Sequence, residues 1–117
     1  ITYDCAGFLG LDYEKEVRNW FFNCATGINI ASILQNGDIF VCPNVPRRKE
    51  LIQGNIRKDN FMDVWNNKFK IFRSVNRTKC EKCAKCDSWE NCLGNSYHLW
   101  DFEKQEPKIC HVDMLSQ

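Results

Sequence analysis

The chain has 117 residues, a formal net charge of +1 and 26% charged residues. This length fits one domain with a modest hydrophobic core, and the balanced charge excludes an overall electrostatic preference for nucleic acid. No apolar run approaches the roughly 20 residues that span a bilayer, and the N-terminus has neither the basic region nor the apolar core of a signal peptide. We therefore expect a soluble, cytoplasmic protein with neither a membrane nor a nucleic-acid partner. Because the sequence does not begin with Met, we also expect a piece of a longer protein.

Residues 1–23 are predicted to form an N-terminal connecting segment, followed by one domain over residues 24–117. The run at residues 12–23 begins with acidic side chains, which are favourable in the first turn of a helix. Asp12 is a candidate N-cap, because its carboxylate can accept a hydrogen bond from a backbone N–H of that turn. We expect a short helix here.

A β-hairpin is predicted at about residues 28–42. Asn36-Gly37 lies between two runs rich in Ile, Leu, Val and Phe. This dipeptide is the strongest short-range hairpin signal, because both central residues of a type I′ turn need a positive φ. Such a hairpin would place Cys24 and Cys42 near its open end, close together in space.

Two short helices are predicted after the hairpin. Phe61, Val64 and Trp65 recur at helical spacing and belong to the expected core, with Asp59 or Asn60 as the candidate N-cap. A second helix is expected to end near residue 73. The fold class that follows is small α+β and stabilised by a metal cluster, with one hairpin, short helices and then a cysteine-rich loop.

Eight of the 117 residues are cysteine. Cys80, Cys83 and Cys86 are spaced at intervals of three, and Cys92 follows. Neighbouring thiols on one tight turn converge, which suits a metal better than disulfide bridges to distant partners. A secreted scaffold with four disulfides remains an alternative. A second alternative is a structural zinc module that only binds a partner, in which these four cysteines or a similar set hold Zn²⁺.

The other polar features carry weaker signals. His98 and His111 are the only histidines, and beside eight cysteines we expect structural hydrogen bonds or surface exposure rather than metal ligation. Seven Lys and Arg residues lie between residues 68 and 85, against Glu81 alone. A solvated face is the first interpretation of this run, compensation of negatively charged thiolate clusters the second, and nucleic-acid binding the third.

The cysteine pattern extends over most of the chain. In order, it reads Cys24, twelve residues, Gly37, four residues, Cys42, a gap, then Cys83-x2-Cys86-x5-Cys92, and finally Cys110. Gly54-Asn55-Ile56 and Phe61-x2-Val64-Trp65 lie between the two cysteine groups. In this spacing, in the hairpin turn and in these two motifs, residues 24–110 resemble the SPASM domain, which carries auxiliary iron–sulfur clusters at the end of radical SAM enzymes.

The resemblance implies two auxiliary [4Fe–4S] clusters. The far cluster is implied to bind Cys83, Cys86, Cys92 and Cys110. The next family ligand of the near cluster corresponds here to Ser96, whose hydroxyl is hard to deprotonate. The near set is therefore expected to be Cys5, Cys24, Cys42 and Cys80. Alternatively, the near cluster keeps an open iron.

The resemblance also implies that the chain is not catalytic alone. The C-x3-C-x2-C motif of the cluster that cleaves S-adenosylmethionine is absent, and 117 residues cannot hold a (β/α) barrel. S-adenosylmethionine is thus expected only in the missing core, a radical SAM barrel in the same parent chain. The domain is expected to relay electrons or bind substrate while a peptide or protein is modified, and zinc can enter the isolated domain adventitiously.

Overall fold

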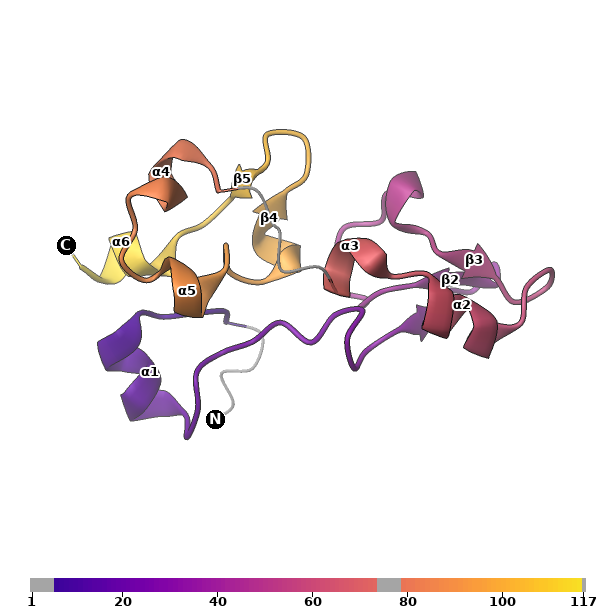
Figure 1. Ribbon diagram of the computed structural model, residues 1–117, viewed down its shortest axis with the longest axis horizontal. Coiled ribbons are helices and arrows are strands. Elements are labelled where there is room, and N and C mark those ends of the chain that lie inside the picture. The colour runs from indigo at the N-terminus through magenta and orange to yellow at the C-terminus, as the bar shows by residue number, and fades with distance from the viewer. Residues whose placement is uncertain (1–5, 74–78, 117) are drawn as a thin grey trace. The chain divides into compact units, whose positions relative to one another are not determined.

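The computed structural model describes residues 6–73 and 79–116 (Figure 1). The chain divides into two compact units. Of the described residues, 6–24 and 79–116 make up one, here called the terminal unit, and 25–73 make up the other, the central unit. The boundary expected between residues 23 and 24 stays a prediction, and the structure groups the N-terminal segment with the C-terminal part of the chain.

A three-stranded antiparallel sheet organises the central unit. Strands β1 (Ser32–Ile33) and β2 (Asp38–Phe40) form the hairpin predicted at residues 28–42, which is confirmed. Strand β3 (Gly54–Asn55) pairs with the other edge of β2 and was not predicted. A 3₁₀ helix, η1 (Lys49–Leu51), buries its last residue just before β3.

The hairpin turn differs from the type I′ turn expected. The N–H of Gly37 donates to the carbonyl oxygen of Leu34 at 2.8 Å, and the N–H of Leu34 donates to the carbonyl oxygen of Asp38 at 2.8 Å. Gly37 has a φ of 90°, whereas Asn36 has no positive φ. The connection is thus a three-residue loop with one left-handed residue. Asn36 contributes its side chain instead, because its Oδ1 accepts the N–H of Asp38.

The two helices predicted after the hairpin are confirmed as α2 (Phe61–Asn67) and α3 (Lys70–Arg73). Asn60 is the N-cap of α2, as expected. Its Oδ1 accepts from the N–H of Met62 at 2.9 Å and from that of Asp63 at 3.1 Å. Two of the donors that a helix start leaves without partners are thereby satisfied.

Aromatic side chains hold α2 and α3 together. Phe69, between the helices, has a φ of 62°, and this left-handed residue separates them. Phe69 and Phe72 are buried with Val64 of α2. The rings of Trp65 and Phe69 meet edge to face at 5.1 Å, and the guanidinium of Arg73 lies 4.4 Å from the centre of the Trp65 ring. The expected core role of this face is thus confirmed for Val64.

In the terminal unit, the expected N-terminal helix forms as α1 (Leu11–Val17). It begins after Gly10, which has a φ of 97° and no side chain with which to cap the helix. The prediction of Asp12 as N-cap is wrong, because Asp12 lies inside the first turn. There its charge still favours the positive end of the helix dipole.

A buried carboxylate fixes α1 to the chain on both sides of it. Glu14 is fully buried. Its side chain accepts the N–H of Leu9 at 2.9 Å and that of Phe22 at 2.7 Å, and it pairs with Arg18. Because a buried charge needs such partners, these contacts allow Glu14 to occupy an interior position.

The rest of the terminal unit is built from short elements. In chain order they are α4 (Glu81–Ala84), α5 (Trp89–Cys92), the 3₁₀ helix η2 (Tyr97–Leu99), β4 (Trp100–Asp101), β5 (Glu106–Pro107) and α6 (His111–Leu115). The expected cysteine-rich loop therefore contains two helical turns, and β4 and β5 form an antiparallel hairpin that was not predicted. The small α+β fold is confirmed. Within residues 6–73 and 79–116, no helix has the length and apolar character needed to cross a membrane.

Candidate metal centre

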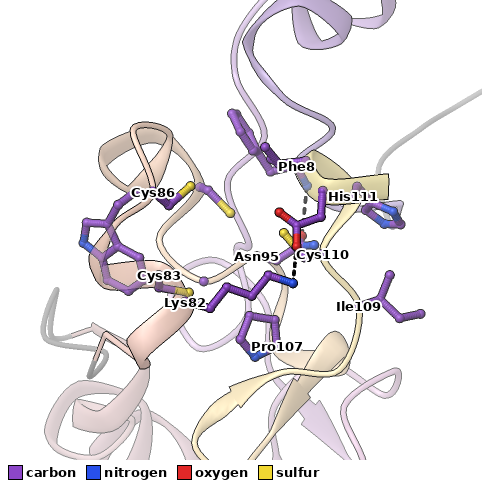
Figure 2. A pocket seen from close by; sticks show the side chains of 14 residues that line it. Phe8, Lys82, Cys83, Cys86, Asn95, Pro107, Ile109, Cys110 and His111 are labelled. Atoms are coloured by element: carbon purple, nitrogen blue, oxygen red, sulfur yellow. Dashed lines mark hydrogen bonds and ion pairs between the residues drawn. The ribbon is translucent and has the colours of Figure 1, made fainter. Parts of the chain in front are cut away.

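Four cysteines line one pocket of the terminal unit. They are Cys83, Cys86, Cys92 and Cys110, the set predicted for the far cluster. Figure 2 shows Cys83 and Cys86 on one side of this cysteine pocket and Cys110 on the other. Most of the remaining wall is apolar and comes from Phe8, Trp89, Pro107, Ile109 and Val112. The arrangement gathers four thiols against a mainly apolar wall, with Cys83 buried and the other three cysteines half-buried.

Short helices position these thiols. Cys83 lies within α4 and Cys92 is the last residue of α5. Cys110 is the N-cap residue of α6. The N–H of Cys86 donates to the carbonyl oxygen of Cys83 at 3.1 Å, which closes the turn between these two cysteines. Each thiol is therefore held by local backbone structure rather than by a long flexible loop.

Burial changes the acidity of two of these thiols. It raises the pKa of Cys83 to about 12, with further increases from the neighbouring Cys80, Cys92 and Cys110. Burial also raises the pKa of Cys92, and backbone hydrogen bonds from Gly94 and Asn95 partly offset this increase. Metal ligands are thiolates, so binding at this pocket must displace the protons of Cys83 and Cys92.

A left-handed turn follows Cys92. Leu93, Gly94 and Asn95 have φ values of 52°, 87° and 70°. Successive N–H groups in such a conformation point into a concavity that can bind anions, including the sulfur of iron–sulfur sites. The backbone hydrogen bonds of Gly94 and Asn95 to Cys92 are of this kind. Hydrogen bonds of this type to sulfur tune the reduction potential of a cluster.

No single-ion site is assembled among the described residues. Within residues 6–73 and 79–116, no three His, Cys, Asp or Glu side chains are grouped closely enough to hold one metal ion. The zinc alternative requires four ligands around one ion. In a [4Fe–4S] cluster, by contrast, each of four thiolates binds a different iron atom.

The comparisons with known proteins bear on this centre. The family model SPASM, described as an iron–sulfur cluster-binding domain, matches residues 24–87, more than half of the chain. The chain belongs to the SPASM family. Comparison with curated proteins and with solved structures found no match. The donor set of this SPASM domain fits an iron–sulfur group, because four cysteines, an apolar wall and backbone N–H donors share one pocket.

Cys80 lies next to the cysteine pocket but does not line it. Cys80 is the N-cap of α4, and its Sγ accepts the N–H of Cys83 at 3.4 Å. It lines a neighbouring surface depression with Lys82, Lys85 and Glu106. Cys110 thus lines the cysteine pocket together with Cys83, whereas Cys80 lines the neighbouring depression.

The near set of the SPASM domain stays a prediction. Cys5 lies outside the described residues, and Cys24 and Cys42 belong to different units. The approach of Cys24 to Cys42 therefore also stays a prediction. The N–H of Cys42 donates to Oγ1 of Thr26 at 2.9 Å. All seven described cysteines are free thiols.

Ser96, where a family ligand was expected, is 1% exposed. Within the described part of the chain, its hydroxyl has no hydrogen-bond partner. The backbone groups of Ser96 do have partners: its N–H donates to Oδ1 of Asn95 at 2.9 Å, and its carbonyl oxygen accepts the N–H of Leu99 at 3.1 Å. The buried hydroxyl thus marks a position that the surrounding protein leaves chemically unsatisfied.

Sequence reasoning missed several residues at the cysteine pocket. Lys82 forms an ion pair with Asp113 beside the pocket, which raises the pKa of Lys82 (Figure 2). His111 also lines the pocket, and its Nε2 is buried without a partner among the described residues. Asn95 and Phe8 line the same pocket. Gly94-Asn95 is a typical turn signal that marks the left-handed segment, whereas nothing in the sequence placed Phe8 here.

Proposed function

We propose that this SPASM domain binds a [4Fe–4S] cluster through Cys83, Cys86, Cys92 and Cys110. The observation that carries the proposal is that these four cysteines line a single pocket with a mainly apolar wall. Four thiolates are the ligand set that a [4Fe–4S] cluster takes in proteins.

The surroundings of the pocket support the proposal. When bound, such a cluster supplies a site that exchanges one electron. The apolar wall, including Phe8 and Trp89, would shield part of a bound cluster from water. Backbone N–H groups after Cys92 stabilise negative charge on its sulfur. Lys82 carries positive charge beside the pocket, which agrees with the second interpretation of the basic run.

A second, near cluster belongs to the same proposal. Its proposed ligands are Cys24, Cys42, Cys5 and Cys80. The alternative with an open iron would leave one coordination position for substrate. The position of Cys80 beside Cys83, at the start of α4, is compatible with a thiol that serves a different group from the cysteine pocket.

At the level of the parent protein, we propose an auxiliary role in a radical SAM enzyme. The barrel that cleaves S-adenosylmethionine would lie elsewhere in the same parent chain, and the domain would relay an electron or bind the substrate. The substrate class is a peptide or protein, and the location is cytoplasmic. Membership of the SPASM family supports this context.

The test compares two cysteines of the terminal unit. The full chain is reconstituted anaerobically with iron and sulfide, as wild type, Cys110→Ser and Cys80→Ser, and followed by visible and electron-paramagnetic-resonance spectra. We expect Cys110→Ser to lose the signal of the cysteine-pocket cluster and Cys80→Ser to keep it. Loss of the same signal in Cys80→Ser, with Cys110→Ser unchanged, would contradict the assignment. A colourless wild type with stoichiometric zinc would establish the zinc module instead.

A further inference from the structure

Asn95 connects two segments that are far apart in the sequence. Its side chain is buried, with 4% of the residue exposed. The Oδ1 atom accepts the backbone N–H of Phe8 at 2.9 Å, across 87 residues of sequence, and Figure 2 shows this hydrogen bond at the cysteine pocket. Asn95 and Phe8 both line that pocket. The amide therefore lies between the N-terminal segment and the turn that follows Cys92.

The Asn95 side chain also packs closely against Gly7, the residue before Phe8. Gly7 has a φ of 85°, and a Cβ atom there would lie 2.1 Å from Oδ1 of Asn95. Only glycine leaves room for the amide at this distance and adopts the left-handed conformation without strain. The backbone at Gly7 and Phe8 is thus packed directly against the Asn95 side chain.

On the other side, Asn95 completes the left-handed turn. Asparagine tolerates a positive φ better than most residues, because its short polar side chain can hydrogen-bond locally. Here Oδ1 accepts the following N–H, that of Ser96, at 2.9 Å. The N–H of Asn95 also donates to the carbonyl oxygen of Cys92 at 2.9 Å. One side chain therefore stabilises the turn and receives the N-terminal segment.

Asn95 thereby contacts two parts of the pocket, the Phe8 wall and the turn after Cys92. Phe8 is 1% exposed and supplies part of the apolar wall. The turn supplies the backbone N–H groups that reach the sulfur of Cys92. If the Asn95 amide is removed, the N–H of Phe8 loses its buried partner and the wall loses an anchor.

We propose that Asn95 is a positioning residue for the cluster: it holds Phe8 over the cysteine pocket and orients the backbone N–H groups that hydrogen-bond to Cys92. The inference rests on the proposed function and deepens it. It adds that the N-terminal segment, through Phe8, sets how well the pocket protects a cluster. Through the turn, Asn95 also affects the reduction potential, because hydrogen bonds to sulfur stabilise the more negative state.

Two substitutions separate the side chain from the backbone conformation. Asn95→Gly keeps the freedom to adopt a positive φ and removes the acceptor, whereas Asn95→Asp keeps both an acceptor oxygen and tolerance of that φ. Phe8→Ala leaves the Phe8 N–H in place and removes only the apolar wall. All are made in the full chain and loaded anaerobically with iron and sulfide.

Three readouts are compared in the loaded proteins: the midpoint potential, the rate of cluster loss in air and the hydrogen-exchange protection of the Phe8 N–H. In Asn95→Gly we expect a lower midpoint potential, lost protection and cluster loss roughly 2- to 10-fold faster, the range of one ordinary hydrogen bond. Asn95→Asp should restore protection. Phe8→Ala should also speed cluster loss in air but keep the midpoint potential closer to that of wild type than Asn95→Gly does.

The outcomes distinguish this inference from the proposed function. A loaded Asn95→Gly protein with the wild-type midpoint potential and wild-type lability in air would overturn the positioning role, even if the Phe8 N–H exchanged faster. If Asn95→Gly does not fold, the other two variants still decide. Wild-type cluster lability in Phe8→Ala would contradict the role of the apolar wall. Wild-type hydrogen-exchange protection of the Phe8 N–H in Asn95→Asp would support the role of the acceptor oxygen. A wild type that takes up no iron would instead overturn the proposed function itself.

Discussion

Burial has the largest effect on the pKa values of Cys83 and Cys92, and it raises both. In a cluster-free chain, the apolar pocket therefore stabilises the protonated thiols. An unperturbed cysteine has a pKa of about 8.5. A group whose pKa is higher in the folded state stabilises the fold below its unfolded pKa, and this contribution is lost as the pH rises towards the folded value.

We therefore predict that the free energy of unfolding of the cluster-free chain falls as the pH rises from about 8.5 towards the pKa of about 12 of Cys83. Urea unfolding with a reductant at a series of pH values measures this fall. Cys83→Ala removes the thiol, so its stability should decrease less steeply over the same window. Equal slopes for the two proteins would contradict the assignment to Cys83.

Ser96 allows a second prediction about a single residue. Its buried hydroxyl has no partner among the described residues, and an unsatisfied buried polar group costs about 1–3 kcal/mol. We expect Ser96→Ala to keep the wild-type iron content and to leave the free energy of unfolding unchanged or higher. If Cys5 and Cys80 complete the near set, as proposed, Ser96→Cys should add no iron. Iron analysis and urea unfolding measure both, and iron loss in Ser96→Ala would identify Ser96 as a ligand.

Among the secondary-structure elements, those with local sequence signals were predictable. The cap of α2 and the hairpin at Asn36-Gly37 follow from side chains that act within a few residues. The type of the hairpin turn was not predictable, because a three-residue loop and a type I′ turn can both contain Asn-Gly. Strand β3 escaped prediction because Gly54–Asn55 has little intrinsic strand preference and exists only through its pairing with β2.

The cap of α2 gives a prediction at this scale. Asn60→Ala removes the acceptor for two backbone N–H groups at the start of the helix. We expect a loss of about 1 kcal/mol in the free energy of unfolding. Asn60→Asp serves as the control, since a carboxylate also caps a helix and should preserve most of the stability. Urea unfolding measures both variants, and a loss in Asn60→Asp equal to that in Asn60→Ala would show that capping is not the cause.

At the scale of the whole molecule, the sequence predicted the members of the cysteine pocket better than its walls. The resemblance to the SPASM domain implied Cys83, Cys86, Cys92 and Cys110 as one set, and the structure places these four cysteines around one pocket. The contribution of Phe8 and its hydrogen bond to Asn95 could not be predicted. That contact joins distant segments, and neither residue type signals it. The near set stays a prediction for a related reason, because its members are spread over both units.

The two units contain different parts of the fold, the sheet in one and the cysteine pocket in the other. The central unit holds the three-stranded sheet with α2 and α3. The terminal unit holds the cysteine pocket, closed by α4, α5 and α6 together with the N-terminal segment. A short domain with few strands has a limited hydrophobic core, so ligation at the pocket is expected to contribute to the stability of the terminal unit.

The central claim is that the cysteines of the terminal unit hold an iron–sulfur cluster, and its most direct test is the composition of the loaded protein. The full chain is reconstituted anaerobically, and iron, acid-labile sulfide and zinc are counted per chain. We expect about four iron and four sulfide for each cluster, with at least one cluster per chain and no stoichiometric zinc. Zinc at one per chain, without labile sulfide after the same treatment, would contradict it.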